Sequence, residues 1–110
     1  MRVLTVDDSR TILAMLRHTL VNAGFEVLQA EDGKQGLDVL KTEDVDVVIT
    51  DINMPVMDGI EFIKHVRASG HHQSLPILIL TTETSQEKRD QGKQAGGTGW
   101  IVKPFDPDKL

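Results

Sequence analysis

Short runs of aliphatic and β-branched residues alternate along the chain with longer amphipathic segments. The short runs predict five β-strands, at residues 2–6, 26–30, 45–50, 77–81 and 99–102. The third and fourth are almost continuously apolar, which is typical of strands buried on both faces of a parallel sheet. The longer segments predict four helices, at residues 9–23, 33–41, 59–69 and 85–95. This alternation, with short connections, predicts a single α/β domain with right-handed crossovers.

The last residues of the chain have the composition of a helix start. Asp106 followed by Pro107 is typical of an N-cap with proline at the first helical position. A parallel sheet needs helices over both faces, so a fifth helix is expected after the fifth strand. Because the sequence stops at Leu110, we expect residues 1–110 to form one domain truncated before its last helix. One face of the sheet would then be uncovered, and two copies of the chain could dimerise through it.

Composition and charge exclude several classes of protein. The 110 residues, 39% of them hydrophobic, suffice for one globular domain with a core. With 17 acidic and 12 basic residues the net charge is -5, which argues against direct nucleic-acid binding. The absence of cysteine excludes disulfides, thiolate zinc sites and a cysteine nucleophile. No segment approaches the ~18 apolar residues of a membrane span or resembles a signal peptide, so we expect a cytoplasmic protein without membrane insertion.

Polar and charged residues stand at the ends of four predicted strands. Asp7 and Asp8 follow the first strand, Asp51 follows the third, Thr81 ends the fourth and Lys103 follows the fifth. Because functional residues of doubly wound sheets gather at the carboxyl ends of the strands, we expect these side chains to converge. Three clustered carboxylates repel one another unless a cation neutralises them, and Mg²⁺ prefers oxygen ligands. The pattern therefore predicts a magnesium site where a carboxylate can accept a phosphoryl group.

Each of these residues also has an ordinary structural explanation. Asp7 and Asp8 could cap the following helix, and Asp51 could belong to a turn. Thr81 is a common strand residue, and Lys103 could be a solvated lysine. The chemical interpretation is favoured only because the four signals occur at four strand ends.

Four segments together resemble the bacterial response-regulator receiver domain, and the resemblance covers the chain except for the absent last helix. They are Val6-Asp7-Asp8-Ser9, residues 50–59 (TDINMPVMDG), Leu80-Thr81-Thr82-Glu83 and Lys103-Pro104-Phe105. Residues 57–62, 80–83 and 98–105 most resemble stand-alone chemotaxis regulators of this family. The resemblance implies a flavodoxin-like, doubly wound parallel sheet of five strands in the order 2-1-3-4-5.

The resemblance also implies roles for the strand-end residues. Asp51 would be the phosphoacceptor and would receive its phosphate from a histidine kinase. Asp8, Asp51 and the backbone carbonyl of Asn53 would ligate Mg²⁺, with Asp7 acting through a bound water. Lys103 would pair with the acceptor carboxylate and then with the phosphoryl oxygens.

The same resemblance implies a switch and a slow return to the resting state. Thr81 would hydrogen-bond the phosphoryl group, and Trp100 stands where the family has a switch aromatic, usually Tyr or Phe. Asn53 can orient a water but cannot accept its proton, which indicates slow self-dephosphorylation of Asp51. Asn53 together with Glu83 resembles the pair found in chemotaxis regulators, for which release is fairly quick for a receiver.

The sequence therefore predicts a phosphorylation-switched signalling protein rather than an enzyme. Its expected partners are a histidine kinase and a downstream protein such as a flagellar motor switch component. Three alternatives stay open: part of a larger response regulator with a transcriptional or other output, a Mg²⁺-dependent phosphohydrolase with an aspartyl-phosphate intermediate, and a flavin-binding domain. Asn53 argues against the phosphohydrolase, and the Asp7-Asp8 pair stands where a flavin domain has its phosphate-binding loop.

Overall fold

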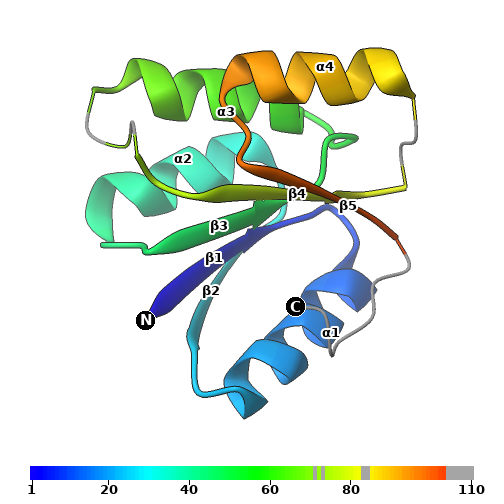
Figure 1. The fold of residues 1–110 in the computed structure, drawn as a ribbon. Helices are drawn as coiled ribbons and strands as arrows, with labels where there is room; N and C mark the ends of the chain where they lie inside the picture. Colours follow the sequence, from blue (N-terminus) through cyan, green and yellow to red (C-terminus); the bar gives the residue numbers. More distant parts are fainter. Residues whose placement is uncertain (71, 73, 83–84, 104–110) are drawn as a thin grey trace.

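The fold is a parallel five-stranded sheet with helices on both faces, described by a computed structural model over residues 1–70, 72, 74–82 and 85–103. The strand order is β2-β1-β3-β4-β5, and every neighbouring pair is parallel. The predicted fold class and strand order are confirmed (Figure 1). Along the chain the elements are β1 (Arg2–Val6), α1 (Arg10–Asn22), β2 (Glu26–Ala30), α2 (Gly33–Thr42), β3 (Val47–Thr50), α3 (Gly59–Ala68), β4 (Ile77–Thr81), α4 (Gln86–Ala95) and β5 (Gly99–Val102).

The four helices begin where the sequence offers a capping side chain. Ser9, Asp32, Asp58 and Ser85 each accept a hydrogen bond from the backbone N–H three residues later. Such a bond satisfies one of the N–H groups that the first helical turn leaves without a partner. The first and fourth helices therefore begin one residue later than the predicted segments, because their first residue is the cap.

The third strand is shorter than predicted, starting at Val47 instead of residue 45. The Arg2 N–H donates to the Asp46 carboxylate at 2.8 Å instead of to a backbone carbonyl. Regular pairing between β1 and β3 then begins with Val3 opposite Val47. At this end the Asp46 N–H still donates to the Arg2 carbonyl at 2.9 Å, but the Arg2 N–H has a side-chain acceptor. The apolar pattern of the segment does not encode that bond.

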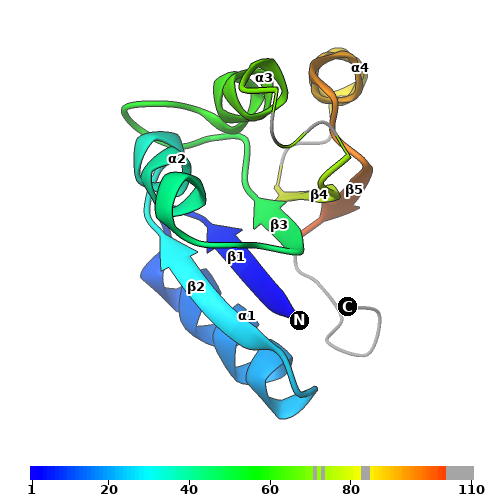
Figure 2. The ribbon, with the colours of Figure 1, turned by 90° about the vertical axis from the view of Figure 1, so that its left-hand side faces the viewer.

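The helices cover the sheet unequally. Helices α2, α3 and α4 lie over one face and α1 over the other (Figures 1 and 2). The larger core, which includes Leu4, Val48, Phe62, Ile63 and Ile77, lies beneath the three helices. The smaller core packs alternate strand residues against α1. Its buried members are Val3, Leu16, Leu20, Ile49 and Leu80. This alternation buries both faces of the central strands and leaves their carboxyl ends to carry the polar residues.

Among the described residues, α1 is the only helix on its face of the sheet. Leu78 of β4 and Ile101 of β5 lie on this face and are partly buried at the edge of the smaller core. The predicted helix start at Asp106 and Pro107 lies outside the described residues. Of the helices that the structure describes, none has the length and apolarity needed to cross a membrane.

Candidate functional site

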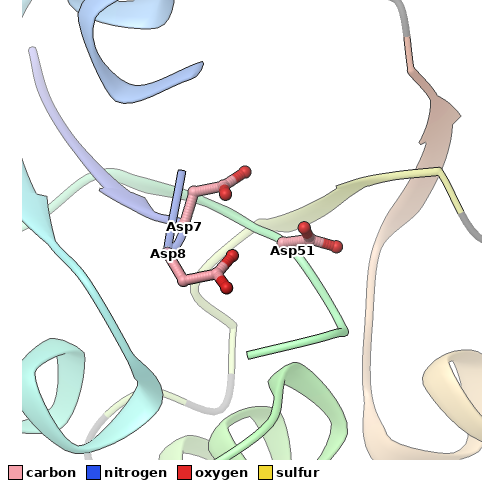
Figure 3. A group of neighbouring side chains, drawn as sticks. All are labelled: Asp7, Asp8 and Asp51. Carbon is pink, nitrogen blue, oxygen red and sulfur yellow. The ribbon is translucent and has the colours of Figure 1, made fainter. Parts of the chain in front are cut away.

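Three carboxylates meet where β1 and β3 end. Asp7 and Asp8 follow β1 and Asp51 follows β3, and each offers an oxygen within 4.8 Å of the other two (Figure 3). Asp7 and Asp51 are buried, whereas Asp8 is exposed. β1 and β3 are neighbours in the sheet although β2 lies between them in the sequence. The cluster therefore lies at the point where the strand order reverses, the usual ligand position in this class of fold.

Lys103 connects two of these carboxylates. Its Nζ donates to Asp7 Oδ2 at 2.8 Å and to Asp51 Oδ2 at 2.9 Å. Its side chain is only 10% exposed, so it is not the solvated lysine of the alternative interpretation. Burial alone lowers the pKa of Lys103, but the hydrogen bonds and charges of Asp7 and Asp51 outweigh it, and the pKa is raised. The ammonium group is therefore a fixed positive charge beside Asp51.

Asp7 is a buried carboxylate whose charged form is disfavoured by its surroundings. Burial raises the pKa of the Asp7 carboxyl, and the hydrogen bonds from Lys103 and from the Ser9 N–H only partly offset the rise. The Ser9 N–H donates to Asp7 Oδ1 at 2.9 Å, while Ser9 itself caps α1. Asp7 is therefore not the helix cap, and its second oxygen lies toward Lys103. The cost of burying this charge is a reason to expect a cation here.

Asp51 is held in place by the backbone around it. Its own N–H donates to the Val6 carbonyl, which ties the start of the loop to the end of β1. Its Oδ1 accepts the Ile52 N–H at 2.6 Å and the Asn53 N–H at 3.4 Å. Asp51 therefore makes the turn contacts of the alternative interpretation, and its Oδ2 still reaches Lys103. The carboxylate is oriented on one oxygen by the backbone and on the other by the ammonium.

Gly59 packs directly behind Asp51, a contact that sequence reasoning missed. A Cβ on Gly59, the first residue of α3, would clash with the Asp51 carbonyl oxygen. The Gly59 N–H donates to the Ile52 carbonyl at 2.8 Å. The Asp58-Gly59 pair indicated a turn, but nothing local in the sequence indicated this approach between α3 and the end of β3.

The donor set suits a hard divalent cation. With all three acids ionised, three carboxylates and one ammonium give a formal charge of −2, which one divalent cation would cancel. Mg²⁺ takes oxygen ligands at about 2.0–2.1 Å and is usually held by one or two carboxylates together with waters. Asp8 is exposed, so its side of the cluster is open to those waters. Among the described residues, this is the one group of acids and histidines close enough to hold a metal.

The remaining predicted residues lie around this cluster to different extents. Thr81 is fully buried at the end of β4, and its carbonyl accepts the Lys103 N–H at 2.8 Å. Asn53 is exposed, with its backbone beside Asp51. Trp100 lies on β5 against α4 and contacts the larger core. Glu83 lies outside the described residues.

The comparison with protein families identifies the chain at the family level. The model of the response regulator receiver domain matches residues 3–110. The chain belongs to the response regulator receiver family. A Campylobacter jejuni chemotaxis protein CheY homolog is 44% identical over 112 residues, covering 100% of this chain and 86% of that protein. Vibrio cholerae chemotaxis protein CheY-3 is 42% identical, covering 96% and 82%.

Solved receiver structures agree with the fold. Vibrio cholerae CheY4, crystallised at low pH, superimposes with a TM-score of 0.95 at 52% identity, covering 99% of this chain and 91% of that one. The receiver domain of the Pseudomonas aeruginosa sensor histidine kinase PA1611 has a TM-score of 0.91 at 28% identity, covering 99% and 89%. That structure has a magnesium ion coordinated in its active site cleft.

These relationships confirm the predicted general function. The chain is a two-component signalling receiver homologous to the chemotaxis protein CheY. Receiver domains of this kind are signalling proteins rather than conventional enzymes. The flavin-binding alternative is therefore set aside.

Proposed function

We propose that this receiver domain accepts a phosphoryl group on Asp51 from a histidine kinase, in a reaction that requires Mg²⁺. The observation that carries the proposal is the pairing of Asp51 with Lys103 at 2.9 Å, within a cluster of three carboxylates. Asp8, Asp51 and the backbone carbonyl of Asn53 would hold the ion, with Asp7 beside them. When bound, the ion neutralises charge on the phosphoryl oxygens, which is most of what phosphoryl transfer requires. The magnesium seen in the PA1611 receiver supports this choice of ion.

The transfer step uses Asp51 and the Lys103 side chain that pairs with it. An Asp51 carboxylate oxygen attacks the phosphorus atom, and the bond from phosphorus to the donor imidazole nitrogen breaks. The electron pair of that bond stays on the imidazole, whose other ring nitrogen carries a proton taken from water, so that the ring leaves as the neutral base. Lys103 Nζ, which pairs with Asp51 before the reaction, then pairs with a phosphoryl oxygen. Because Lys103 is also bonded to Asp7, it is already oriented when the phosphoryl group arrives.

The pairing of β4 with β5 supports a mechanism for the switch. The Thr81 hydroxyl would bond the new phosphoryl group, and Trp100 on the adjacent strand would respond to its movement. β4 and β5 pair directly, with Ile79 opposite Trp100 and Thr81 opposite Val102. The surface of α4 and β5 would then change its affinity for a downstream protein. Phosphorylation shifts this equilibrium only by the extent to which it stabilises the active state.

The phosphorylated state should last longer than an enzyme intermediate. Hydrolysis needs a water whose proton is accepted as its oxygen bonds to phosphorus and the bond to Asp51 breaks. Asn53, two residues after the acceptor, cannot accept that proton. We therefore infer slow self-dephosphorylation and expect no repeated turnover on a phosphomonoester.

The experiment that tests the proposal is intact mass spectrometry after incubation with Mg²⁺ and a small-molecule phosphodonor. The wild-type chain is expected to gain one phosphoryl group and to lose it with time. The matched variant Asp51→Asn keeps the shape of the side chain, and we expect it to gain none. Omitting Mg²⁺, or adding a chelator, should abolish the gain in the wild type. A folded wild-type chain that gains no phosphoryl group would remove Asp51 from the role of acceptor, and repeated turnover would favour a phosphohydrolase.

The chemotaxis relatives point to the partners. We propose a histidine kinase as donor and a flagellar motor switch component as the downstream protein, in the cytoplasm.

We also propose that two copies pair through the sheet face over β4 and β5, where Leu78 and Ile101 are only partly buried. Light scattering on the phosphorylated and unphosphorylated chain tests the pairing, and a monomer at all concentrations would count against it.

A further inference from the structure

Helix α4 has very little apolar surface with which to hold on to the sheet. Its ten residues, Gln86–Ala95, bury only Gly92 and Ala95. A helix of this length is marginal in water on its own and depends on tertiary contacts. A glycine inside it lowers its stability further. Helix α4 is held against α3 and, through Gly96, by Arg67, and the contacts at Gly92 are its attachment to the sheet.

The indole of Trp100 occupies the space that Gly92 leaves open. A Cβ on Gly92 would lie 3.3 Å from Trp100 Cζ3 and 2.8 Å from Ile79 Cδ1. Ile79 is buried and stands opposite Trp100 in the sheet. A side chain at position 92 would press first on the flexible end of Ile79, and the ring would also have to give way by a few tenths of an ångström. We call this site, formed by Gly92, Ile79 and Arg89, the Trp100 seat.

Arg89 lies over the Trp100 ring on its solvent side. Its guanidinium carbon lies 5.8 Å from the centre of the Trp100 ring, within the range of a cation–π contact. The indole Nε1 is buried, and among the described residues it has no hydrogen-bond partner. A buried indole N–H usually finds an acceptor. The ring is held by its packing and by Arg89, and among the described residues it makes no hydrogen bond.

We propose that Gly92 is a positioning residue that fixes the resting place of Trp100 and thereby couples α4 to the phosphorylation site. The inference rests on the proposed function, in which Trp100 responds to phosphorylation of Asp51. While the ring is in its seat, Gly92 and Arg89 of α4 contact β5 through it. When the ring moves, α4 loses these contacts with Trp100, and the seat empties beside Arg89.

A stability cycle tests the seat itself. In an ordinary helix interior, Gly→Ala stabilises the fold, because alanine has the better helix propensity. At this position we expect Gly92→Ala to lower the urea midpoint, because the added methyl group displaces the ring. In a Trp100→Ala background, where Ile79 gains room to move, the same change should raise the midpoint. Gln94→Ala, at an exposed position of the same helix, is the control and should not depend on Trp100. A rise in the midpoint in both backgrounds would overturn the seat.

Fluorescence tests the coupling, since Trp100 is the single tryptophan of the chain. With Mg²⁺ and a small-molecule phosphodonor, we expect the wild-type emission to change as Asp51 is phosphorylated. In Gly92→Ala the resting emission should already differ, and the change on phosphorylation should fall to less than half. Intact mass measured on the same samples should show equal phosphorylation of both proteins, because Gly92 lies outside the acceptor site.

The outcomes separate the two proposals. If both proteins are phosphorylated and Gly92→Ala keeps the wild-type emission and its full response, the role of Gly92 is refuted while the proposed function stands. If the folded wild-type protein is not phosphorylated, the proposed function fails and the coupling fails with it. The stability cycle still decides in that case whether the ring and Gly92 share one space.

Discussion

Replacing Gly59 by alanine is the sharpest test of how the acceptor is positioned. The new Cβ would clash with the Asp51 carbonyl oxygen and would lie 2.8 Å from the Ile52 Cα. Both of these neighbours are backbone atoms, which cannot rotate away. Contacts of real Cβ atoms essentially never fall under 3.0 Å, so α3 and the end of β3 must separate by about 1 Å. That separation would also stretch the hydrogen bond from the Gly59 N–H to the Ile52 carbonyl, now 2.8 Å.

The size of the effect follows from this displacement. Overpacking costs about 1–3 kcal/mol, and the weakened hydrogen bond adds about 1 kcal/mol. We therefore expect Gly59→Ala to lower the free energy of unfolding by about 2–4 kcal/mol. Because Asp51 moves with its own carbonyl, the carboxylate shifts relative to Lys103. A 1 Å misplacement of reacting groups can reduce a rate about 100-fold, and we expect a loss of this order in the phosphorylation rate.

The assay combines urea unfolding with a mass-spectrometric time course of phosphorylation. The matched control is Gly24→Ala, at an exposed position whose φ is +94° and where a Cβ meets nothing within 4 Å. Its left-handed backbone should cost about 1–2 kcal/mol of stability. Because Gly24 is remote from Asp51 in the fold, its phosphorylation rate should stay at the wild-type value. If Gly59→Ala is phosphorylated at the wild-type rate, or if the two variants slow phosphorylation equally, the reasoning about Gly59 is wrong.

Three further predictions concern stability. Arg67→Met removes the guanidinium that donates to the Gly96 carbonyl at 2.7 Å and 3.2 Å. We expect the free energy of unfolding to fall by about 1.5–3 kcal/mol and amide exchange in α4 to become faster. Unchanged exchange in α4 would contradict this. Val56→Gly relieves a β-branched residue held at φ 67°; we expect urea unfolding to show a gain of about 1 kcal/mol, and a loss would show that the strain is absent. Because the pKa of Asp7 is raised in the fold, its protonation stabilises the fold at pH below the unfolded value and this contribution is lost as pH rises through the folded one. In urea unfolding, the metal-free wild type should therefore lose more stability than Asp7→Asn as the pH rises from about 4, near the pKa of an unfolded aspartate, to 8, and equal slopes would refute it.

Much of the fold could be read from local sequence because its determinants are local. Alternating apolar runs and helical stripes depend on residues a few positions apart, and they placed all nine described elements to within about two residues. Serine and aspartate caps fixed the helix starts by bonds that span three residues. The error at residue 45 arose where a distant side chain, Asp46, bonds to Arg2.

The sequence also named the chemistry of the site but not its geometry. Asp7, Asp8 and Asp51 follow strands, and parallel strands bring their carboxyl ends to one edge. The family resemblance implied the pair of Lys103 with Asp51, but that Lys103 also pairs with Asp7 required the folded chain, because the two residues are 96 positions apart. The same reason explains why the charge balance of the cluster, and the raised pKa of Asp7, come only from the structure.

Glycines mark the boundary between what the sequence by itself determined and what only the tertiary structure decided. Gly59 was visible as the start of a helix, whereas Gly92 was only one residue of a predicted helix. Neither pattern names the atom that approaches: the Asp51 carbonyl in one case and the Trp100 ring in the other. Periodicity and capping act within one element and are written in adjacent residues. Close approaches between elements depend on how the sheet and its helices pack, so only the folded chain decides them.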